Sequence, residues 1–456
     1  MSLLRSINPA TGEEIQRIDE MNADEVAAII DAADEAFSKW RRELIVDRAE
    51  LLRRAAADLL QRKEKLAALM AREMGKPVTQ GKGEIEKCAL VCEYYAKNGA
   101  GFLEPEVIET DELRSSVHFE PLGLILAVMP WNFPFWQVFR FAAPTLLAGN
   151  AVVLKHSSNV TGCALAIESV FRRAGFPEAL FRTLLIGSKK VEAVIENPKI
   201  RAVMLTGSVE AGKAVASVAG ANLKKTVLEL GGSDPYLILA DADLEKAAEI
   251  CAKSRLINSG QSCIAAKRFL VVESVREKFE KLLVEKMKSQ FLGDPLEPGT
   301  EVGPLAREDL RDEVHEQVVA SLEKGAVRLL GGEELDRPGA FYLPTVLTDV
   351  APGMPAFDEE LFGPVAAIVP VRDDEEAIER ANQSRFGLGA AVFTANTRRG
   401  KEIAATRLEA GACFVNDFVR SDPRLPFGGI KDSGYGRELG SFGIREFVNI
   451  KTVCVG

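Results

Sequence analysis

The 456-residue chain carries 57 Lys and Arg residues against 67 Asp and Glu residues, a formal net charge of −10 at pH 7. Nucleic-acid binding requires clustered cations, and the absence of basic runs disfavours that kind of partner. Hydrophobic residues make up 47% and charged residues 27% of the chain, a composition typical of a folded globular protein. Its length indicates two or three domains.

The seven cysteines contain no Cys-x-x-Cys pair and the three histidines lie far apart in sequence. No zinc-binding spacing occurs, so no metal site is expected. The most apolar region, residues 122–131, is well short of the roughly 18 residues that a bilayer requires, and the N-terminus does not resemble a signal peptide. We therefore expect a cytoplasmic protein with reduced thiols and no membrane partner.

In chain order, apolar residues recur at helical spacing over 23–40 and 47–74, and Gly75 before Pro77 indicates a helix end. The first hundred residues are thus predicted to be largely helical. From about residue 116, short apolar strands alternate with helix-like segments, which predicts an α/β fold with parallel sheets covered on both faces. The first unit has strands near 124–129, 151–154, 203–205, 226–230 and 236–240. The second has strands near 268–272, 365–370, 390–394 and 411–415, helices near 274–291, 306–323, 373–383 and 396–406, and surface connections at 293–304 and 331–355.

Two nucleotide-binding signatures are incomplete. No G-x-G-x-x-G occurs, and the stretch GSVEAGKA from Gly207 nearly matches a Walker A loop but has Ala214 where Ser or Thr should bind magnesium. What remains is a strand, a turn at Thr206-Gly207-Ser208 and a helix whose free N–H groups can hold a phosphate. A tight turn without any ligand is the alternative interpretation.

Three residues form a candidate acyl-transfer set. Cys263 lies in a loop of small residues, where backbone N–H groups can stabilise an accessible thiolate, although a small core cysteine is the alternative. Glu229 ends an apolar strand before two glycines, where a carboxylate serves as a base or caps a loop. Asn132 lies between two prolines and can donate to an oxyanion or form its own turn. Together they supply a nucleophile, a base and an oxyanion stabiliser.

On seven ordered motifs, the sequence resembles the aldehyde dehydrogenase superfamily over nearly its whole length. The motifs are PWNFP (130–134), VVLKHSS (152–158), LTGSVEAG (205–212), ELGG (229–232), GQSC (260–263), EELFGPV (359–365) and PFGGIKDSGYGRELG (426–440). The resemblance implies an aldehyde dehydrogenase-like α/β fold that assembles as a homodimer or homotetramer. Its parts would be a variant Rossmann cofactor domain (1–101 and 121–231), an α/β catalytic domain (232–435) and a small β oligomerisation arm (102–120 and 436–456).

The resemblance also implies roles for individual residues. Cys263 would attack the aldehyde, Asn132 and the Cys263 N–H would hold the oxyanion, and Glu229 would activate the water that hydrolyses the thioester. Cofactor contacts are expected at Trp131, Lys155, Ser158, Gly207, Ser208, Gly212, Leu230, Glu360 and Phe362. Among them, Glu360 and Phe362 match the nicotinamide ribose contacts, Ser208 the pyrophosphate contact and Lys155 the adenosine ribose contact.

One departure from the family pattern bears on cofactor choice. Many NAD-specific members carry Lys-Pro-Ser-Glu where this chain reads Lys155-His156-Ser157-Ser158. A glutamate at the last position would repel a 2′-phosphate, whereas Ser158 and Lys155 can donate to it. The sequence therefore predicts that NADP is preferred and that NAD is a second cofactor; a serine that is merely tolerated is the alternative.

Substrate binding is predicted from one cation in an apolar helix. Arg140 lies four residues after Trp136, hence on the same helical face, and a buried guanidinium needs a partner. That partner is either a protein carboxylate or the distal carboxylate of a substrate. Ser262 and Ser421 could supply further donors. Within the superfamily, the chain looks most like the short bacterial succinate-semialdehyde dehydrogenases, so we expect oxidation of succinate semialdehyde to succinate.

Three alternatives stay open. The same chemistry could act on glutarate semialdehyde or an aromatic aldehyde. The fold could belong to a catalytically silent structural or binding protein, which the presence of Cys263, Glu229 and Asn132 disfavours. A P-loop hydrolase would show magnesium-dependent ATP hydrolysis, which we do not expect.

Overall fold

The computed structural model describes residues 3–111, 114–333, 335 and 337–456. The chain begins with a hairpin that the sequence analysis did not predict, followed by four helices. These elements are β1 (Leu3–Ile7), β2 (Glu14–Asp19), α1 (Ala23–Trp40), α2 (Ile45–Gln61), α3 (Lys63–Met74) and α4 (Val78–Phe102). The predicted helix over 23–40 is confirmed, whereas the 47–74 stretch is two helices separated at Arg62. Gly75 ends α3 in the left-handed conformation with φ 78°, as its position before Pro77 predicted.

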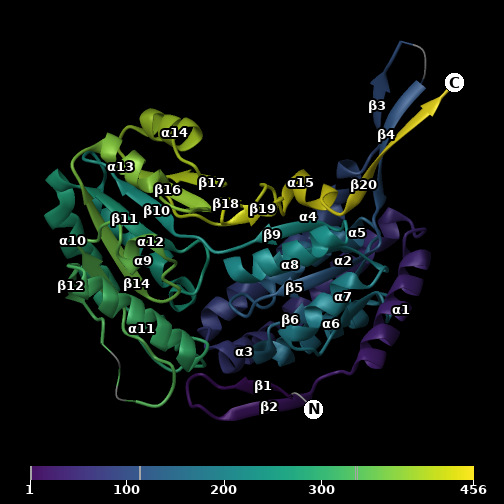
Figure 1. Cartoon of the computed structure of the whole chain (residues 1–456), viewed down its shortest axis with the longest axis horizontal. Coiled ribbons are helices and arrows are strands. Elements are labelled where there is room, and N and C mark those ends of the chain that lie inside the picture. The colour runs from purple at the N-terminus through teal and green to yellow at the C-terminus, as the bar shows by residue number, and fades with distance from the viewer. Residues whose placement is uncertain (1–2, 112–113, 334, 336) are drawn as a thin grey trace.

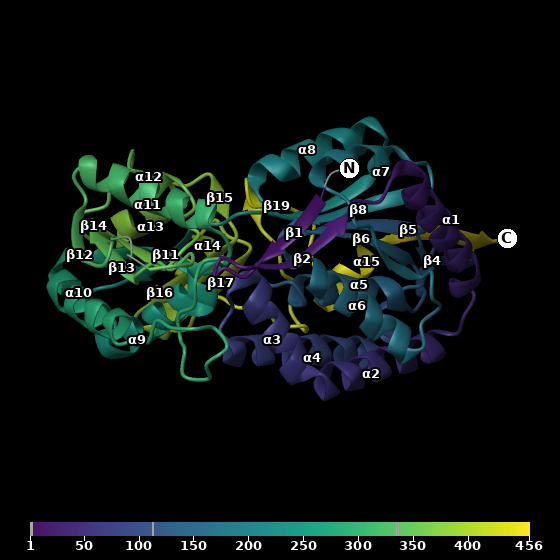
Figure 2. The same ribbon diagram turned by 90° about the horizontal axis from the view of Figure 1, so that it is seen from below.

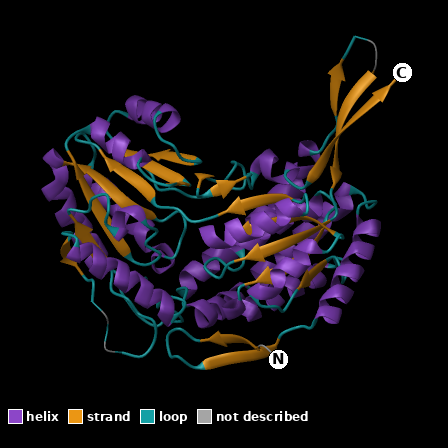
Figure 3. Cartoon of the chain, in the orientation of Figure 1, coloured by secondary structure: helices purple, strands orange, loops and turns teal. Residues whose placement is uncertain are grey.

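A six-stranded sheet forms the first α/β unit, in the order β19-β9-β8-β5-β6-β7. Its strands are β5 (Leu124–Met129), β6 (Ala151–His156), β7 (Phe181–Thr183), β8 (Ile200–Thr206), β9 (Lys225–Glu229) and β19 (Gly434–Tyr435). All neighbours pair in parallel except β19, which is antiparallel to β9. Helices cover both faces of this sheet (Figure 3). The helices and short 3-10 turns of this unit are α5 (Trp136–Leu147), η1 (Ser158–Val160), α6 (Thr161–Ala174), η2 (Ser188–Lys190), α7 (Val191–Glu196) and α8 (Val209–Ala221). The hairpin β1–β2 lies in front of this half in Figure 2.

A seven-stranded sheet forms the second unit, in the order β12-β13-β14-β11-β10-β16-β17. Its strands are β10 (Asp234–Ile238), β11 (Ala266–Val272), β12 (Val327–Leu330), β13 (Thr345–Thr348), β14 (Val365–Val371), β16 (Gly389–Phe393) and β17 (Ala412–Val415). The helical elements around it are α9 (Leu244–Leu256), η3 (Ile257–Gly260), α10 (Glu273–Lys288), α11 (Glu308–Glu323), α12 (Pro355–Asp358), α13 (Asp374–Asn382) and α14 (Thr397–Thr406). A small pair, β15 (Phe386–Gly387) with β18 (Ile430–Lys431), lies outside this sheet.

The predicted strands and helices of this second unit are confirmed, with small shifts of their ends. The expectation of a long surface connection over 331–355 is wrong for residues 345–348, which form the buried strand β13 between β12 and β14. A run of four apolar and Thr residues among prolines and glycines is too short to be recognised by its period alone.

Three strands form a ribbon that projects from the body of the molecule (Figure 1). They are β3 (Glu106–Glu109), β4 (Arg114–Pro121) and β20 (Val448–Val455), in the order β20-β4-β3. The last helix, α15 (Gly440–Arg445), packs beside α4 and α5 in the body. The segment 436–456, predicted as arm, thus contributes β20 to the ribbon and α15 to the body; the domain boundaries themselves stay a prediction.

The two large sheets bring functional residues to one place from opposite strand ends. Residues that follow β5, β6, β8 and β9 lie at the carboxyl edge of the six-stranded sheet, where ligands of open α/β sheets bind. Cys263 precedes β11 and Glu360 precedes β14, and these two strands are parallel neighbours. No helix of the described ranges combines the length and hydropathy that crossing a bilayer demands.

Candidate active site

A cavity of about 720 Å³ lies between the two α/β units. The predicted nucleophile, the predicted oxyanion donor and several of the predicted cofactor contacts line this cavity. The predicted residues that line it are Trp131, Asn132, Gly207, Ser208, Leu230, Cys263, Glu360 and Phe362. Residues more than two hundred positions apart in sequence therefore share one cavity.

Asn132 is oriented by a buried hydrogen-bond chain. Its Oδ1 accepts from Gln137 Nε2 at 3.0 Å, and its Nδ2 donates to the Gln261 carbonyl at 3.1 Å. Asn258 Nδ2 donates to the Asn132 carbonyl at 2.8 Å. Because an amide nitrogen has two hydrogens, Asn132 keeps a donor for an oxyanion. The side chain is fixed by its neighbours, so the alternative of an Asn that merely forms its own turn is not what the structure shows.

Cys263 is partly exposed and lines the same cavity as Asn132. Burial raises the pKa of its thiol to about 12, while the Lys267 and Arg140 cations act in the opposite direction. Burial therefore acts against the thiolate that the sequence analysis considered. Desolvation outweighs the nearby positive charges because a thiolate loses its hydration in the cavity wall.

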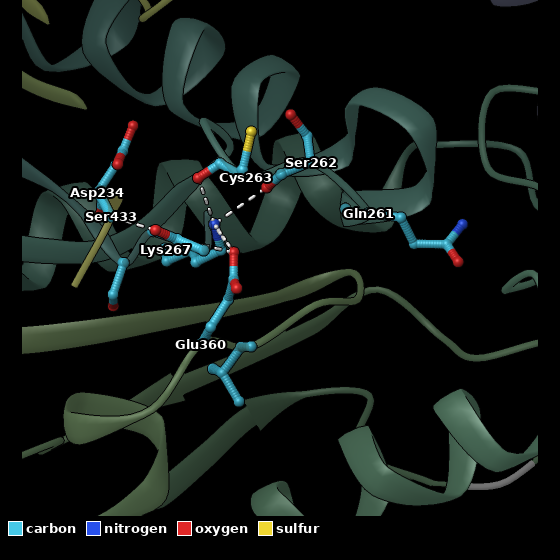
Figure 4. A network of polar contacts seen from close by, with 12 residues as sticks. Asp234, Gln261, Ser262, Cys263, Lys267, Glu360 and Ser433 are labelled. Carbon is cyan, nitrogen blue, oxygen red and sulfur yellow. Dashed lines mark hydrogen bonds and ion pairs between the residues drawn. The ribbon is translucent and has the colours of Figure 1, made fainter. Parts of the chain in front are cut away.

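Lys267 donates hydrogen bonds to the backbone of the loop that contains Cys263 (Figure 4). Its Nζ donates to the carbonyl oxygens of Cys263 at 2.7 Å and Ser262 at 3.0 Å, and lies 3.1 Å from Glu360 Oε1. Glu360 Oε1 also accepts from the Gly232 N–H at 3.1 Å. One fully buried ammonium thus connects the cysteine loop to the carboxylate predicted to contact the cofactor.

Glu229 ends β9 and is buried, with no hydrogen-bond partner for either carboxylate oxygen among the described residues. Burial raises its pKa well above the usual value, and the negative charge of Glu438 raises it further. Burial and the Glu438 charge therefore both disfavour the ionised form of this carboxyl group. It does not line the cavity itself, although Leu230 and Gly231, the next two residues, do.

The predicted strand-turn-helix at residues 200–221 is confirmed. Ser208 is the N-cap of α8 and accepts from the Ala211 N–H at 3.2 Å. Gly212 lies one turn further on, where a Cβ atom would be 2.6 Å from the Leu230 side chain. Gly212 therefore does not line the cavity but lets Leu230 pack against α8. Trp131 and Phe362, which both line the cavity, form an edge-to-face pair with centroids 5.7 Å apart.

Lys155 and Ser158 lie at the end of β6, outside the main cavity. Ser158 is exposed and begins η1, and Lys155 is partly buried with its pKa lowered by desolvation. No carboxylate of the described chain lies within ion-pair distance of Lys155. His156, between them, is buried; its Nε2 donates to the Pro134 carbonyl at 3.0 Å, and burial lowers its pKa to about 4.

The four predicted substrate residues are buried, but they contact different parts of the protein. Arg140 Nη2 lies 2.5 Å from Glu438 Oε2, both side chains being 4% exposed, so its partner in this structure is the protein carboxylate that the sequence left as an alternative. A direct contact of Arg140 with substrate stays a prediction. Ser262 is buried beside Cys263 (Figure 4), while Trp136 and Ser421 are buried and both contact Lys87.

Sequence reasoning missed Lys87, Lys267 and Glu438. A signal existed for Lys267, because it precedes Arg268 inside the apolar strand β11, whose residues are all buried. A lysine in such a strand needs a polar partner. Lys87 and Glu438 gave no such signal, since their partners lie far away in the chain.

The fold, the cavity and the positions of Cys263 and Asn132 define an aldehyde dehydrogenase. The model of the aldehyde dehydrogenase family matches residues 2–453, and the chain belongs to that family.

Several members of the family are similar to this chain over nearly its whole length. The chain is 50% identical over 452 residues to a probable NADP-dependent succinate-semialdehyde dehydrogenase of Synechocystis, covering 99% of both chains. It is 47% identical to the NAD(P)-dependent succinate semialdehyde dehydrogenase Sad of Escherichia coli, covering 98% of this chain and 97% of that one. A crystal structure of the succinic semialdehyde dehydrogenase of Streptococcus pyogenes with NADP superimposes with a TM-score of 0.97 at 38% identity, covering 99% of both chains.

Proposed function

We propose that this chain oxidises succinate semialdehyde to succinate with NADP as the preferred cofactor and NAD as a second one. The observation that carries the proposal is the shared cavity, where Cys263 and Asn132 meet the phosphate-binding turn at Gly207 and Ser208. The substrate and cofactor named for the relatives support the choice among aldehydes.

The residues present fit a dinucleotide. The N–H groups of Val209 and Glu210, the first two residues of α8, can donate to a pyrophosphate beside Ser208. Glu360, held on one oxygen by Lys267 and Gly232, keeps its second oxygen for ribose hydroxyls. Ser158, exposed beside Lys155, puts a hydroxyl rather than a repelling carboxylate at that position. When bound, the nicotinamide supplies the acceptor for the aldehyde hydride.

Cys263 performs the first covalent step. Its sulfur bonds to the aldehyde carbon, the carbonyl electron pair moves to oxygen, and the thiol proton leaves through the open cavity. Asn132 Nδ2 and the Cys263 N–H stabilise the oxyanion. The Asn132 amide is fixed beforehand by Gln137 and Gln261, so little reorganisation is needed as the charge develops.

Glu229 acts in the second half of the reaction. After hydride loss, the acyl group is a thioester on Cys263, and water must attack its carbonyl. Glu229, in its ionised form, takes a proton from that water and leaves the free acid and the thiol. Its partnerless carboxyl group in a buried position fits a group kept for a proton transfer rather than for a structural hydrogen bond.

The three-stranded ribbon is proposed to join subunits into a dimer or tetramer. Val107 is 81% exposed and Ile450 is 64% exposed on strands of this ribbon, and β3 and β20 are its two edges. Exposed apolar edge strands pair readily with another chain.

Initial-rate kinetics on an aldehyde panel test the proposed function. We expect kcat/KM to be highest for succinate semialdehyde, above glutarate semialdehyde, butanal and benzaldehyde, and higher with NADP than with NAD. Preference for another aldehyde would replace the proposed substrate, and absence of NADPH formation with every aldehyde would support the silent-protein alternative.

A further inference from the structure

The turn that precedes Cys263 has three consecutive residues in the left-handed region of backbone space. Asn258, Ser259 and Gly260 have φ angles of 54°, 55° and 79°. Glycine adopts this conformation freely, whereas a residue with a Cβ atom is strained in it, and asparagine tolerates it better than most residues do. Strained backbone persists where the surrounding structure holds it, and it is enriched at functional sites. We therefore expect the contacts of this turn to serve the nearby nucleophile.

The Asn258 side chain joins the segment of the oxyanion donor to the segment of the nucleophile. Its Nδ2 donates to the Asn132 carbonyl at 2.8 Å and to the Gln261 carbonyl at 3.1 Å. Asn132 Nδ2 donates to the same Gln261 carbonyl at 3.1 Å, and Gln261 lies two residues before Cys263 on one loop (Figure 4). An amide nitrogen has two hydrogens, so Asn258 makes both of its bonds at once. Three hydrogen bonds thus hold the Asn132 amide beside the cysteine loop.

The amide group of Asn258 is satisfied at its nitrogen and not at its oxygen. Its Oδ1 is buried and has no hydrogen-bond partner among the described residues, and a buried acceptor without a partner is unfavourable. An aspartate would tolerate the positive φ but would place an acceptor against the two carbonyl oxygens, and a glycine would remove the donor. The amide nitrogen is therefore the part of the Asn258 side chain that the site uses.

Asn258 is also held at both polar groups of its backbone. Its N–H donates to Oε1 of Gln80, on α4, at 2.7 Å, and its carbonyl accepts from Gln261 Nε2 at 3.2 Å. Gln261 Oε1 accepts from the Ala306 N–H at 2.8 Å, in the loop before α11. The turn is thus fixed to two distant segments of the chain, and its side chain reaches Asn132 from a fixed position.

Ser259, the next residue, shares the backbone conformation of Asn258 but has a different partner. Its Oγ donates to the Gly303 carbonyl and accepts from the Gly303 N–H, each at 3.0 Å. Among the described hydrogen bonds of these two adjacent side chains, those to Asn132 come from Asn258 alone. Ser259 therefore provides a matched comparison, because it stabilises the same turn without touching the oxyanion donor.

We propose that Asn258 is a positioning residue, which holds the Asn132 amide in place relative to Cys263 so that its free hydrogen meets the oxyanion. Asn258 is not among the residues that line the cavity, and it acts through the Asn132 and Gln261 carbonyls. The inference rests on the proposed function, in which Asn132 stabilises the oxyanion. A donor must lie about 3 Å from the oxygen on which charge develops, and a misplacement of about 1 Å can cost about 100-fold in rate.

Steady-state kinetics of the full-length enzyme at saturating NADP test this role in a double-mutant cycle. Asn258→Gly permits the left-handed turn and removes the amide, and we expect kcat/KM to fall by about 100-fold. The fall should be the same for succinate semialdehyde and for butanal, because the oxyanion is common to both. In an Asn132→Ala enzyme, the same substitution should change kcat/KM by less than about threefold, since no donor remains to be positioned.

Further measurements distinguish positioning from a general disturbance of the turn. Alkylation of Cys263 by iodoacetamide forms no oxyanion, so its rate in Asn258→Gly should stay within about threefold of wild type. Ser259→Gly removes the contact with Gly303 in the same turn, and kcat/KM should stay within about threefold of wild type because Asn132 is untouched. Should Asn258→Gly fail to fold, Asn258→Asp takes its place in the cycle with the same expected loss, because it retains the size of the side chain and tolerates the positive φ.

The outcomes separate this inference from the proposed function. If Asn132→Ala alone leaves kcat/KM unchanged, the proposed function loses its oxyanion donor. If Asn132→Ala is slow but Asn258→Gly is as active as wild type, or lowers kcat/KM equally in both backgrounds, the role of Asn258 alone is overturned. A loss of alkylation rate as large as the loss in kcat/KM would also overturn it, because the variant would then disturb the whole cysteine loop.

Discussion

Arg140 Nη2 lies 2.5 Å from Glu438 Oε2, and both side chains are 4% exposed. Arg140 also stacks over the Phe427 ring, 4.8 Å from its centroid. The pair joins α5 to the loop before α15, two segments nearly three hundred residues apart, and lies close enough to Glu229 to influence its ionisation. Arg140 therefore has a protein carboxylate as its partner in this structure, while its contact with substrate stays a prediction.

Breaking this pair from one side should destabilise the enzyme. Glu438→Gln leaves the buried guanidinium without a counter-charge, which we expect to lower the free energy of unfolding by about 3 kcal/mol. Denaturant unfolding measures the loss. Lys225→Met is the control, because its partner Glu446 forms a more exposed pair at 2.7 Å and such pairs contribute less than about 1 kcal/mol. Equal losses in the two variants would contradict the assignment.

The link between Lys267 and Glu360 predicts opposite effects on the nucleophile. The Lys267 charge lowers the pKa of Cys263, whereas the Glu360 charge raises it. At a fixed neutral pH, Lys267→Met should slow alkylation of Cys263 by iodoacetamide, and Glu360→Gln should accelerate it. Both variants should raise KM for NADP, since each removes part of the contact that orders the Glu360 carboxylate. Changes of the same sign in the two alkylation rates would refute this account.

The neutral thiol gives a pH prediction for the free enzyme. Because burial raises the pKa of Cys263 to about 12, the thiolate fraction grows about tenfold with each pH unit across the neutral range. The rate of alkylation should rise in proportion from pH 7 to pH 9, in the absence of cofactor. A plateau within that range would mean that the thiolate is already formed.

The sequence predicts some secondary-structure elements of this molecule well and others not at all. The strands β5, β11 and β14 could be predicted because a strand that is buried on both faces of a sheet is a nearly continuous run of apolar residues. The hairpin β1–β2 and the strand β13 were not predicted, because both are short and depend on neighbouring segments that only the folded chain brings close. The same holds for the break at Arg62, which divides an unbroken helical pattern.

The site shows the same division. Motifs around Cys263 and Asn132 are local, and the cavity contains both residues. The partner of Arg140 could not be read from the chain, because Glu438 comes from a distant segment. Lys87 is 334 residues away from Ser421, so nothing in its helix indicated that the two side chains contact each other. The ionisation of Cys263 could not be predicted from the sequence either, because its raised pKa comes from desolvation by residues that only the folded chain brings around it.

Cofactor choice can be tested at a single position. Ser158→Glu places a carboxylate beside Lys155, where it should repel a 2′-phosphate and accept from ribose hydroxyls. We expect kcat/KM for NADP to fall by about 100-fold and kcat/KM for NAD to stay level or rise. Initial rates with each cofactor at saturating aldehyde give both values. An unchanged ratio would show that Ser158 does not face the 2′ position.

The central claim is that Cys263 carries the acyl group and Glu229 releases it by activating water. Its most direct test is intact and peptide mass spectrometry of Glu229→Gln enzyme mixed with NADP and succinate semialdehyde. We predict one NADPH formed per subunit and a succinyl thioester, cleaved by hydroxylamine, on the peptide that contains Cys263. No adduct together with undiminished turnover, or an adduct on another cysteine, would contradict the account.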